Sequence, residues 1–372
     1  MARKAKSSSW SFTPLDFLLV AVPAAIALRY VPGWGSGAVL FVVAAIAIIP
    51  LAGWMGRATE QLAARTGAGL GGFLNATFGN AAELIIALVA LSKGLTGVVK
   101  ASITGSIIGN LLLVLGASIF LGGMRHPKQT FNQTAARISA TSLGLGAIAL
   151  LIPTVFHRAA ASRPGGWTEA AEQSLSLAIV IVLFLTYCCS LIFHLVTHRD
   201  LFQGPVEEKT AGEAHWPLWQ AVTALTVATA LIAWISEFLV GSIETARHSL
   251  GLTETFVGVV IVALVGNAAE HSTAVWAAWK NKMDLSLTIA TGSSLQMALF
   301  VTPLLVFASY LFGDPMTLEF SLPEIASIVL SVWIVSQISG DGESNWLEGV
   351  QLLSVYVIIA ILFFFLPPLL VF

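Results

Sequence analysis

Long apolar segments alternate with short polar ones along nearly the whole chain. A helix that crosses the hydrocarbon core of a bilayer needs roughly 20 mostly apolar residues, and its backbone must satisfy its hydrogen bonds internally. Eleven segments have this character: about 14–31, 36–55, 70–93, 96–122, 133–156, 173–198, 216–248, 254–279, 284–312, 322–339 and 346–370. The pattern predicts an all-α polytopic membrane protein with eleven transmembrane helices.

The composition supports this interpretation. Of 372 residues, 56% are hydrophobic and only 10% are charged, whereas soluble domains carry about 25% charged residues. The net charge of −2 implies no basic surface, so we expect no nucleic-acid partner. The two cysteines, Cys188 and Cys189, are adjacent and give neither a disulfide framework nor a spaced metal site. We therefore expect the protein to be embedded in the lipid bilayer.

Positive charges indicate the orientation, because Lys and Arg concentrate on the cytoplasmic side of a membrane. If the predicted helices alternate in direction, 12 of the 18 Lys and Arg residues lie on the side of the N-terminus. This distribution predicts a cytoplasmic N-terminus, an external C-terminus and a location in the cell (inner) membrane. Arg3, Lys4 and Lys6 precede the first apolar segment as in a signal peptide. No small-residue cleavage site follows, which favours an uncleaved first helix.

A pentapeptide recurs in the two halves of the chain. Residues 79–83 (GNAAE) are repeated at 266–270, 187 residues later. The same offset aligns 104–106 with 291–293 (TGS), so one register extends over two successive helices. The copies lie five predicted helices apart, and an odd number places them in the membrane in opposite directions. Inverted repeats form a binding site near the bilayer midplane and support alternating access.

The repeat predicts how the chain is divided. Residues 1–35 hold an N-terminal tail and one extra helix, 36–198 the first five-helix repeat, and 216–372 the second. Residues 199–215 form a polar linker between the two repeats. This organisation is typical of a secondary active transporter and not of an enzyme.

Two glutamates are the main candidates for chemistry. Glu83 and Glu270 lie near the middle of apolar helices, where an ionised carboxylate costs several kcal/mol unless it is paired or neutralised. Asn80 and Asn267 precede them by three residues and share their helix faces. Carboxylate and amide oxygens suit a hard divalent cation such as Ca²⁺, and no cysteine or histidine cluster suggests a softer metal. We therefore predict these four residues as ligands of a transported ion, with no cofactor. The alternative is a pair of protonated glutamates that hydrogen-bond between helices, which does not require the pentapeptide twice.

Polar residues on the following helices extend this candidate site. Ser106, Ser293 and Gln296 offer oxygens that complete a coordination shell or relay protons. Asn110 and Ser294 are weaker candidates, since small and polar residues also hold membrane helices together. That packing role is the alternative for the whole group.

His271 is a candidate proton relay because it directly follows Glu270 and a histidine titrates in the physiological range. One residue along a helix turns about 100°, so its ring need not face the site. A packing role explains it equally well, and Leu84 occupies the equivalent position in the first copy.

Four motifs together resemble the calcium/proton exchanger family of the cation/calcium antiporter superfamily. They are 79–83 (GNAAE), 266–271 (GNAAEH), 292–296 (GSSLQ) and 340–349 (GDGESNWLEG). The resemblance extends from about residue 36 to the end. From the residues alone, 341–346 is expected to be a tight loop between helices and not a calcium-binding EF-hand, because it lacks the ligand spacing.

The resemblance implies an eleven-helix fold of inverted five-helix repeats that exports Ca²⁺ from the cytosol in exchange for H⁺. It implies that Glu83 and Glu270 are the exchanging carboxylates. By the same motifs, the residues around them are Asn80, Asn267, Ser106, Ser293 and Gln296.

Other functions fit parts of the pattern. A sodium/calcium exchanger shares the architecture, but it needs charge for several Na⁺ ions. The candidate ligands on the helix after Glu270 are Ser293, Ser294 and Gln296, with no carboxylate among them. A cation channel more commonly assembles a ring of like subunits. An intramembrane enzyme needs a nucleophile or a zinc motif such as His-Glu-x-x-His, which the sequence lacks. The sequence therefore favours Ca²⁺ and H⁺ as the transported ions and leaves the oligomeric state open.

Overall fold

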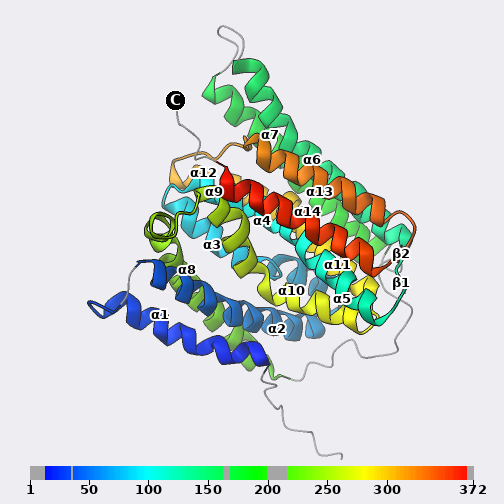
Figure 1. Cartoon of the computed structure of the whole chain (residues 1–372), viewed down its shortest axis with the longest axis horizontal. Helices are drawn as coiled ribbons and strands as arrows, with labels where there is room; N and C mark the ends of the chain where they lie inside the picture. The colour runs from blue at the N-terminus through cyan, green and yellow to red at the C-terminus, as the bar shows by residue number, and fades with distance from the viewer. Residues whose placement is uncertain (1–12, 35–36, 162–167, 199–215, 367–372) are drawn as a thin grey trace, which may run out of the picture.

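The structure, a computed structural model, describes residues 13–34, 37–161, 168–198 and 216–366, without the side chains of residues 67–69, 72 and 76. The predicted linker 199–215 and the start of the predicted N-terminal tail lie outside the described residues. Almost all of the described chain is helical, with the helices packed around one another (Figure 1). The prediction of an all-α protein is confirmed.

The elements follow one another along the chain, with short 3₁₀ or π-helical segments (η) inside several helices. In order they are η1 (Pro14–Val20), α1 (Ala21–Tyr30), α2 (Gly37–Phe78), α3 (Ala81–Ser92), α4 (Thr96–Ile108), η2 (Gly109–Val114), α5 (Leu115–Arg125), β1 (Gln129–Thr130), α6 (Gln133–Ala161), α7 (Glu169–Ile192), η3 (Phe193–Thr197), α8 (Leu218–Leu250), α9 (Glu254–Phe256), η5 (Val257–Val262), α10 (Ala263–Trp279), α11 (Met283–Gln296), η6 (Met297–Val301), α12 (Thr302–Phe312), α13 (Leu322–Ile338), β2 (Glu343–Ser344) and α14 (Trp346–Phe365).

Eight helical segments of the described chain are long and apolar enough to cross a membrane. They are Gly37–Thr66, Thr96–Arg125, Gln133–Ala161, Glu169–Thr197, Leu218–Leu250, Glu254–Trp279, Met283–Phe312 and Trp346–Phe365. Two shorter apolar helices, Ala81–Ser92 and Leu322–Ile338, accompany them. The protein is therefore an integral, multi-pass membrane protein.

The predicted boundaries at 36–55 and 70–93 were wrong. The stretch between them is helical, so that α2 runs from Gly37 to Phe78. The helix bends sharply within this stretch, since a Cβ atom on Gly71 would collide with the backbone carbonyl of Ala63, two helical turns away. Glycine-rich sequence permits such a bend. The second predicted segment 70–93 is divided in turn, because α2 ends at Phe78 and α3 begins at Ala81.

Glycines let α5 and α14 pack backbone against backbone. A Cβ atom on Gly349 would collide with the backbone nitrogen of Phe120, and one on Gly116 would lie 3.0 Å from Cβ of Leu352. Helices in a bilayer associate mainly through such close packing, because lipid tails are as apolar as the side chains they would replace. The paired glycines thus fix α14, the last described helix, against α5 of the first half.

Three connections meet at one end of the helices. β1, after α5, pairs antiparallel with β2, before α14, and Lys128 forms an ion pair of 2.5 Å with Glu343. The Gln129 side chain also donates to the carbonyl of Ala278 at the end of α10 (2.8 Å). The predicted loop at 341–346 is confirmed, and it contains a short strand that the sequence did not indicate.

Candidate cation-binding site

Glu83 and Glu270 each pack against the glycine that begins the other's pentapeptide. A Cβ atom on Gly266 would lie 2.8 Å from Cγ of Glu83, and one on Gly79 would lie 3.1 Å from Oε1 of Glu270. Because glycine has no side chain, the two glycines leave room for the two carboxyl groups. The two copies of the pentapeptide thus contact each other through these glutamates and glycines.

The chain holds the two glutamates in different local structures. In the first copy the helix is interrupted at Gly79 and Asn80, and Glu83 lies in the first turn of α3. In the second copy Asn267 and Glu270 both lie inside the continuous helix α10. The halves thus share a sequence motif but differ in conformation.

Asn80 occupies the N-cap position of α3, yet its side chain makes no cap hydrogen bond. Instead, its Nδ2 donates to Oε1 of Gln296 (2.5 Å), and its Oδ1 accepts from the hydroxyl of Ser293 (2.7 Å). The interrupted helix therefore directs this amide toward α11 of the second half.

Asn267 makes the corresponding contact in the other direction. Its Nδ2 donates to the hydroxyl of Ser106 (3.1 Å) and to the carbonyl of Ala263 (2.9 Å). Ser106 and Ser293 thus each bond to the asparagine of the opposite half, whereas Ser294 donates to the backbone carbonyls of Ile107 and Ala290. The residues predicted around the two glutamates from both halves are brought together in one cluster.

Asn110 has a larger role than the sequence indicated. Its Nδ2 donates to Ser293 Oγ (2.9 Å) and to Asn267 Oδ1 (3.3 Å), and its Oδ1 lies 3.1 Å from His271 Nε2. Asn110 lies in the π-helical segment η2, and the equivalent position of the second half falls at the start of η6. Such π-helical turns occur frequently at functional sites. Its signal in the sequence was its place four residues after Ser106, on the same helix face.

His271 is connected to the cluster but does not contact the glutamates directly in the bonds described. Its Nε2 reaches the cluster through Asn110, and the ring is only partly exposed. The contact with Asn110 is compatible with both roles considered from the sequence, proton relay and packing.

Three carboxylate oxygens at the centre of the site have no hydrogen-bond partner in the described part of the chain. They are both oxygens of Glu83 and Oε2 of Glu270, and all three are buried. An unpaired buried charge is strongly unfavourable, so such carboxylates require a cation or a proton. The arrangement is chemically suited to hold one or the other between the two halves.

Comparisons with known proteins show the family of the chain. The family model described as "Sodium/calcium exchanger protein" matches residues 36–196 and 220–365. The chain is 47% identical to a Ca²⁺/H⁺ antiporter of Synechocystis over 367 residues, covering 95% of this chain and 97% of the relative. It is also 47% identical to the Ca²⁺/H⁺ antiporter ChaA of Bacillus subtilis, covering 94% and 99%.

A solved structure has the same fold. The structure of native YfkE superposes with a TM-score of 0.81 at 44% identity, over 95% of this chain and 100% of that one. Such agreement over nearly the full length of both chains leaves no large part of either fold unmatched. The chain therefore belongs to the calcium/proton exchanger family, within the sodium/calcium exchangers, and is a transporter and not an enzyme.

Proposed function

We propose that this protein exports Ca²⁺ from the cytosol in exchange for H⁺, and that Glu83 and Glu270 bind the two ions in turn. The observation that carries the proposal is the set of three buried carboxylate oxygens without a partner, contributed by both halves. Relatives that are 47% identical are named Ca²⁺/H⁺ antiporters. Hard oxygen ligands of this kind are those that Ca²⁺ prefers.

The surrounding residues supply neutral oxygens to the same place. Asn80 and Asn267 contribute amide oxygens, and Ser106, Ser293 and Gln296 complete the shell or relay protons. With Ca²⁺ bound, two carboxylates balance its charge, and with the ion released, two protons neutralise the same carboxylates. The empty site thus returns without an uncompensated charge in the membrane, which would be costly.

The different conformations of the halves support alternating access. Glu83 is 3% exposed, whereas Glu270 and Gln296 are partly exposed. The polar residues Ser272 and Thr273, which follow Glu270 toward the turn at 280–282, are exposed as well. Greater exposure beside Glu270 than beside Glu83 is expected of one state of an inverted-repeat transporter, and exchange of conformations between the repeats would give the opposite state.

The positions of the connections support eleven membrane helices in two inverted repeats. The connection after α5 contacts Asn281 in the connection after α10, and it pairs with the connection before α14, at one end. At the other end, His157 near the end of α6 contacts Glu319 before α13, and Thr253 before α9 bonds to the carbonyl of Phe363 near the end of α14. Successive connections thus lie at alternate ends of the helices. We assign the end with the connections after α5 and α10, together with the N-terminus, to the cytosolic side of the cell membrane.

The second candidate function is sodium/calcium exchange, which the family description includes. The polar groups that bond around the two glutamates are amides and hydroxyls, so they add no charge for several Na⁺ ions. Ca²⁺ uptake into proteoliposomes with an imposed pH gradient, measured with and without Na⁺, separates the two. We expect uptake that requires the pH gradient and is unaffected by Na⁺. Uptake that follows a Na⁺ gradient at equal pH would reject the proposal.

A further inference from the structure

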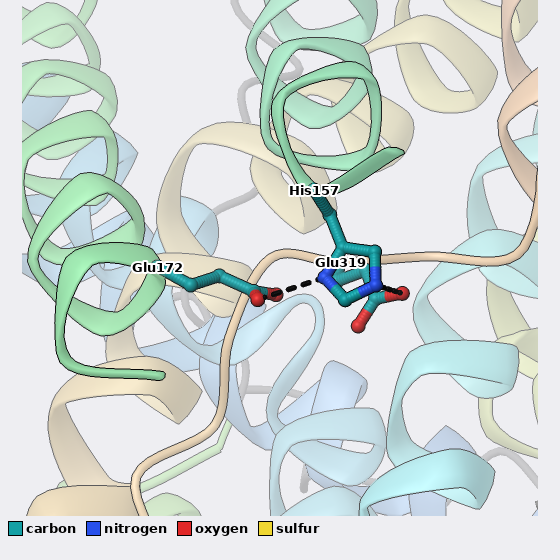
Figure 2. Close-up of side chains that lie close together, drawn as sticks. All are labelled: His157, Glu172 and Glu319. Carbon is teal, nitrogen blue, oxygen red and sulfur yellow. Dashed lines mark hydrogen bonds and ion pairs between the residues drawn. The ribbon is translucent and has the colours of Figure 1, made fainter. Parts of the chain in front are cut away.

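A histidine and two glutamates meet outside the exchange site, at the end of the molecule where α6 and α7 project beyond their neighbours (Figures 1 and 2). His157 lies near the end of α6, Glu172 in the first turn of α7 and Glu319 in the connection before α13. One potential ligand atom from each lies within 4.8 Å of the others. Because Glu319 is distant in the chain from the other two residues, this cluster could not be predicted from the sequence.

Figure 2 shows the imidazole ring of His157 between the two carboxylates, with a different nitrogen toward each. Nδ1 lies 2.9 Å from Oε2 of Glu172, which is a hydrogen-bond distance. Nε2 lies 3.4 Å from Oε1 of Glu319, which is longer than an ordinary hydrogen bond. Two ligands of one tetrahedral Zn²⁺ ion, each at about 2.0–2.1 Å, are separated by about 3.4 Å. The two contacts of the ring therefore have different geometries.

The geometry points to a binding site for a divalent metal ion of the Zn²⁺ class, in which His157 Nε2 and Glu319 are the protein ligands. We assign to Glu172 the role of a positioning residue that accepts the Nδ1 proton of His157. Metal-binding histidines nearly always donate their second ring proton to a carboxylate or carbonyl, which fixes the tautomer and raises the basicity of the other nitrogen. Glu172 suits this role because it is 2% exposed and fixed in the first turn of α7.

The surroundings of the cluster favour a cation and leave room for water ligands. An open cavity of about 500 Å³ is lined by His157, Arg158, Ala161 and Glu319. Lys100 interacts electrostatically with Glu172, Glu319 and Glu324, so three carboxylates face one ammonium group there. Arg158 is exposed at the rim of the cavity, where water screens its charge. Among the described residues near the Nε2 atom that we assign as a ligand, the three carboxylates outnumber the two cationic side chains, Lys100 and Arg158.

Titration of the full chain with Zn²⁺ tests the site, with Co²⁺ absorption as a spectroscopic report of the ligand geometry. The protein carries Glu83→Gln and Glu270→Gln, so that the exchange site cannot bind the probe and failure of the proposed transport function does not affect the result. We expect His157→Gln and Glu319→Gln each to remove one Zn²⁺ equivalent and the Co²⁺ signal. Glu172→Gln should weaken the affinity by about 10- to 100-fold while the complex still forms.

His126→Gln is the matched control, because His126 caps α5 at the opposite end of the helices. It should leave the titration and the spectrum unchanged. Glu319 lies in the connection before α13 and its side chain is 39% exposed, so Glu319→Gln should fold normally. This variant keeps the test decisive if His157→Gln disturbs folding. The proposal is rejected if the parent protein lacks the Co²⁺ signal, if His157→Gln and Glu319→Gln retain it, or if His126→Gln removes it.

Discussion

Cγ of Glu83 lies 2.8 Å from the point where a side chain on Gly266 would begin, so the carboxylate of one half occupies the space left by a glycine of the other. The reciprocal contact joins Glu270 to Gly79. These contacts explain in physical terms why glycine precedes the asparagine in both copies of the motif. A larger residue at Gly266 would displace the Glu83 side chain.

Gly266→Ala should therefore impair exchange more than it impairs folding. The added methyl group overlaps the stem of Glu83, and such overpacking typically costs about 1–3 kcal/mol. If that energy is lost from ion binding, apparent Ca²⁺ affinity falls about 5- to 150-fold, at about 1.4 kcal/mol per tenfold. Gly292→Ala is the control, since a Cβ atom there meets nothing within 4 Å. Equal effects of both substitutions would contradict this account.

Glu83→Gln and Glu270→Gln should each abolish Ca²⁺/H⁺ exchange in proteoliposomes. Glutamine preserves the shape of the protonated acid but cannot alternate between a charged and a neutral form. Folding should be retained, because an amide avoids the charge of a buried, unpartnered carboxylate. Glu343→Gln, which removes a partly exposed ion pair with Lys128, is the control and should transport normally. Near-normal coupled transport by either site variant would exclude the two-glutamate mechanism.

Much of this arrangement could be predicted from the sequence, because the bilayer imposes long apolar helices and the repeat fixes which residues correspond. The pentapeptide alone identified Glu83, Glu270 and their asparagines. The boundaries of α2 could not be predicted, since the charged residues after position 56 are typical of a loop between membrane helices. In the structure, Arg57 of α2 pairs with Asp16 of η1 (2.7 Å), so its charge is compensated and the helix continues.

Contacts between segments that are distant in the chain could not be predicted from the sequence either. Asn110 contacts Ser293, Asn267 and His271 only because helices of both halves converge, and a polar residue on a membrane helix is equally typical of packing. The π-helical segment that contains Asn110 has no recognised sequence signature. The His157 cluster was missed for a similar reason, because its members come from separate elements.

Asn110→Ala should weaken Ca²⁺ binding by about 5- to 150-fold. Removing a buried hydrogen-bonding side chain that leaves its partners unsatisfied costs about 1–3 kcal/mol, and here the partners include Asn267 and Ser293. Calorimetric titration of the purified variant measures the change. Asn281→Ala is the control, because Asn281 bonds to Gln129 at the end of the helices and away from the site. An unchanged affinity would show that Asn110 only joins helices.

Apparent Ca²⁺ affinity should fall as the pH is lowered, because Ca²⁺ and protons compete for the same carboxylate oxygens. Ca²⁺ binds the ionised pair, and protonation removes that form, so acidification can only oppose binding. Two coupled carboxylates allow up to two protons to be released for each Ca²⁺ bound. Calorimetry in buffers of different ionisation enthalpy counts those protons. An affinity independent of pH between about 5.5 and 8.5 would contradict direct competition.

Voltage distinguishes two protons per Ca²⁺ from three. Two carboxylates carry either one Ca²⁺ or two protons as a neutral unit, so exchange by Glu83 and Glu270 alone is electroneutral. A third proton would move an extra charge, worth about 2.3 kcal/mol per 100 mV.

His271 is the residue placed to carry a third proton, since its Nε2 reaches the site through Asn110 (3.1 Å). Leu84 occupies the equivalent position, so the motif of the first half contains no histidine there, which favours the electroneutral scheme. Reversal potentials in liposomes of defined pH, Ca²⁺ and K⁺-diffusion voltage should therefore not shift with voltage. A voltage-dependent reversal would reject the count of two, and its loss in His271→Ala, but not in the control His126→Ala, would identify His271 as the third carrier.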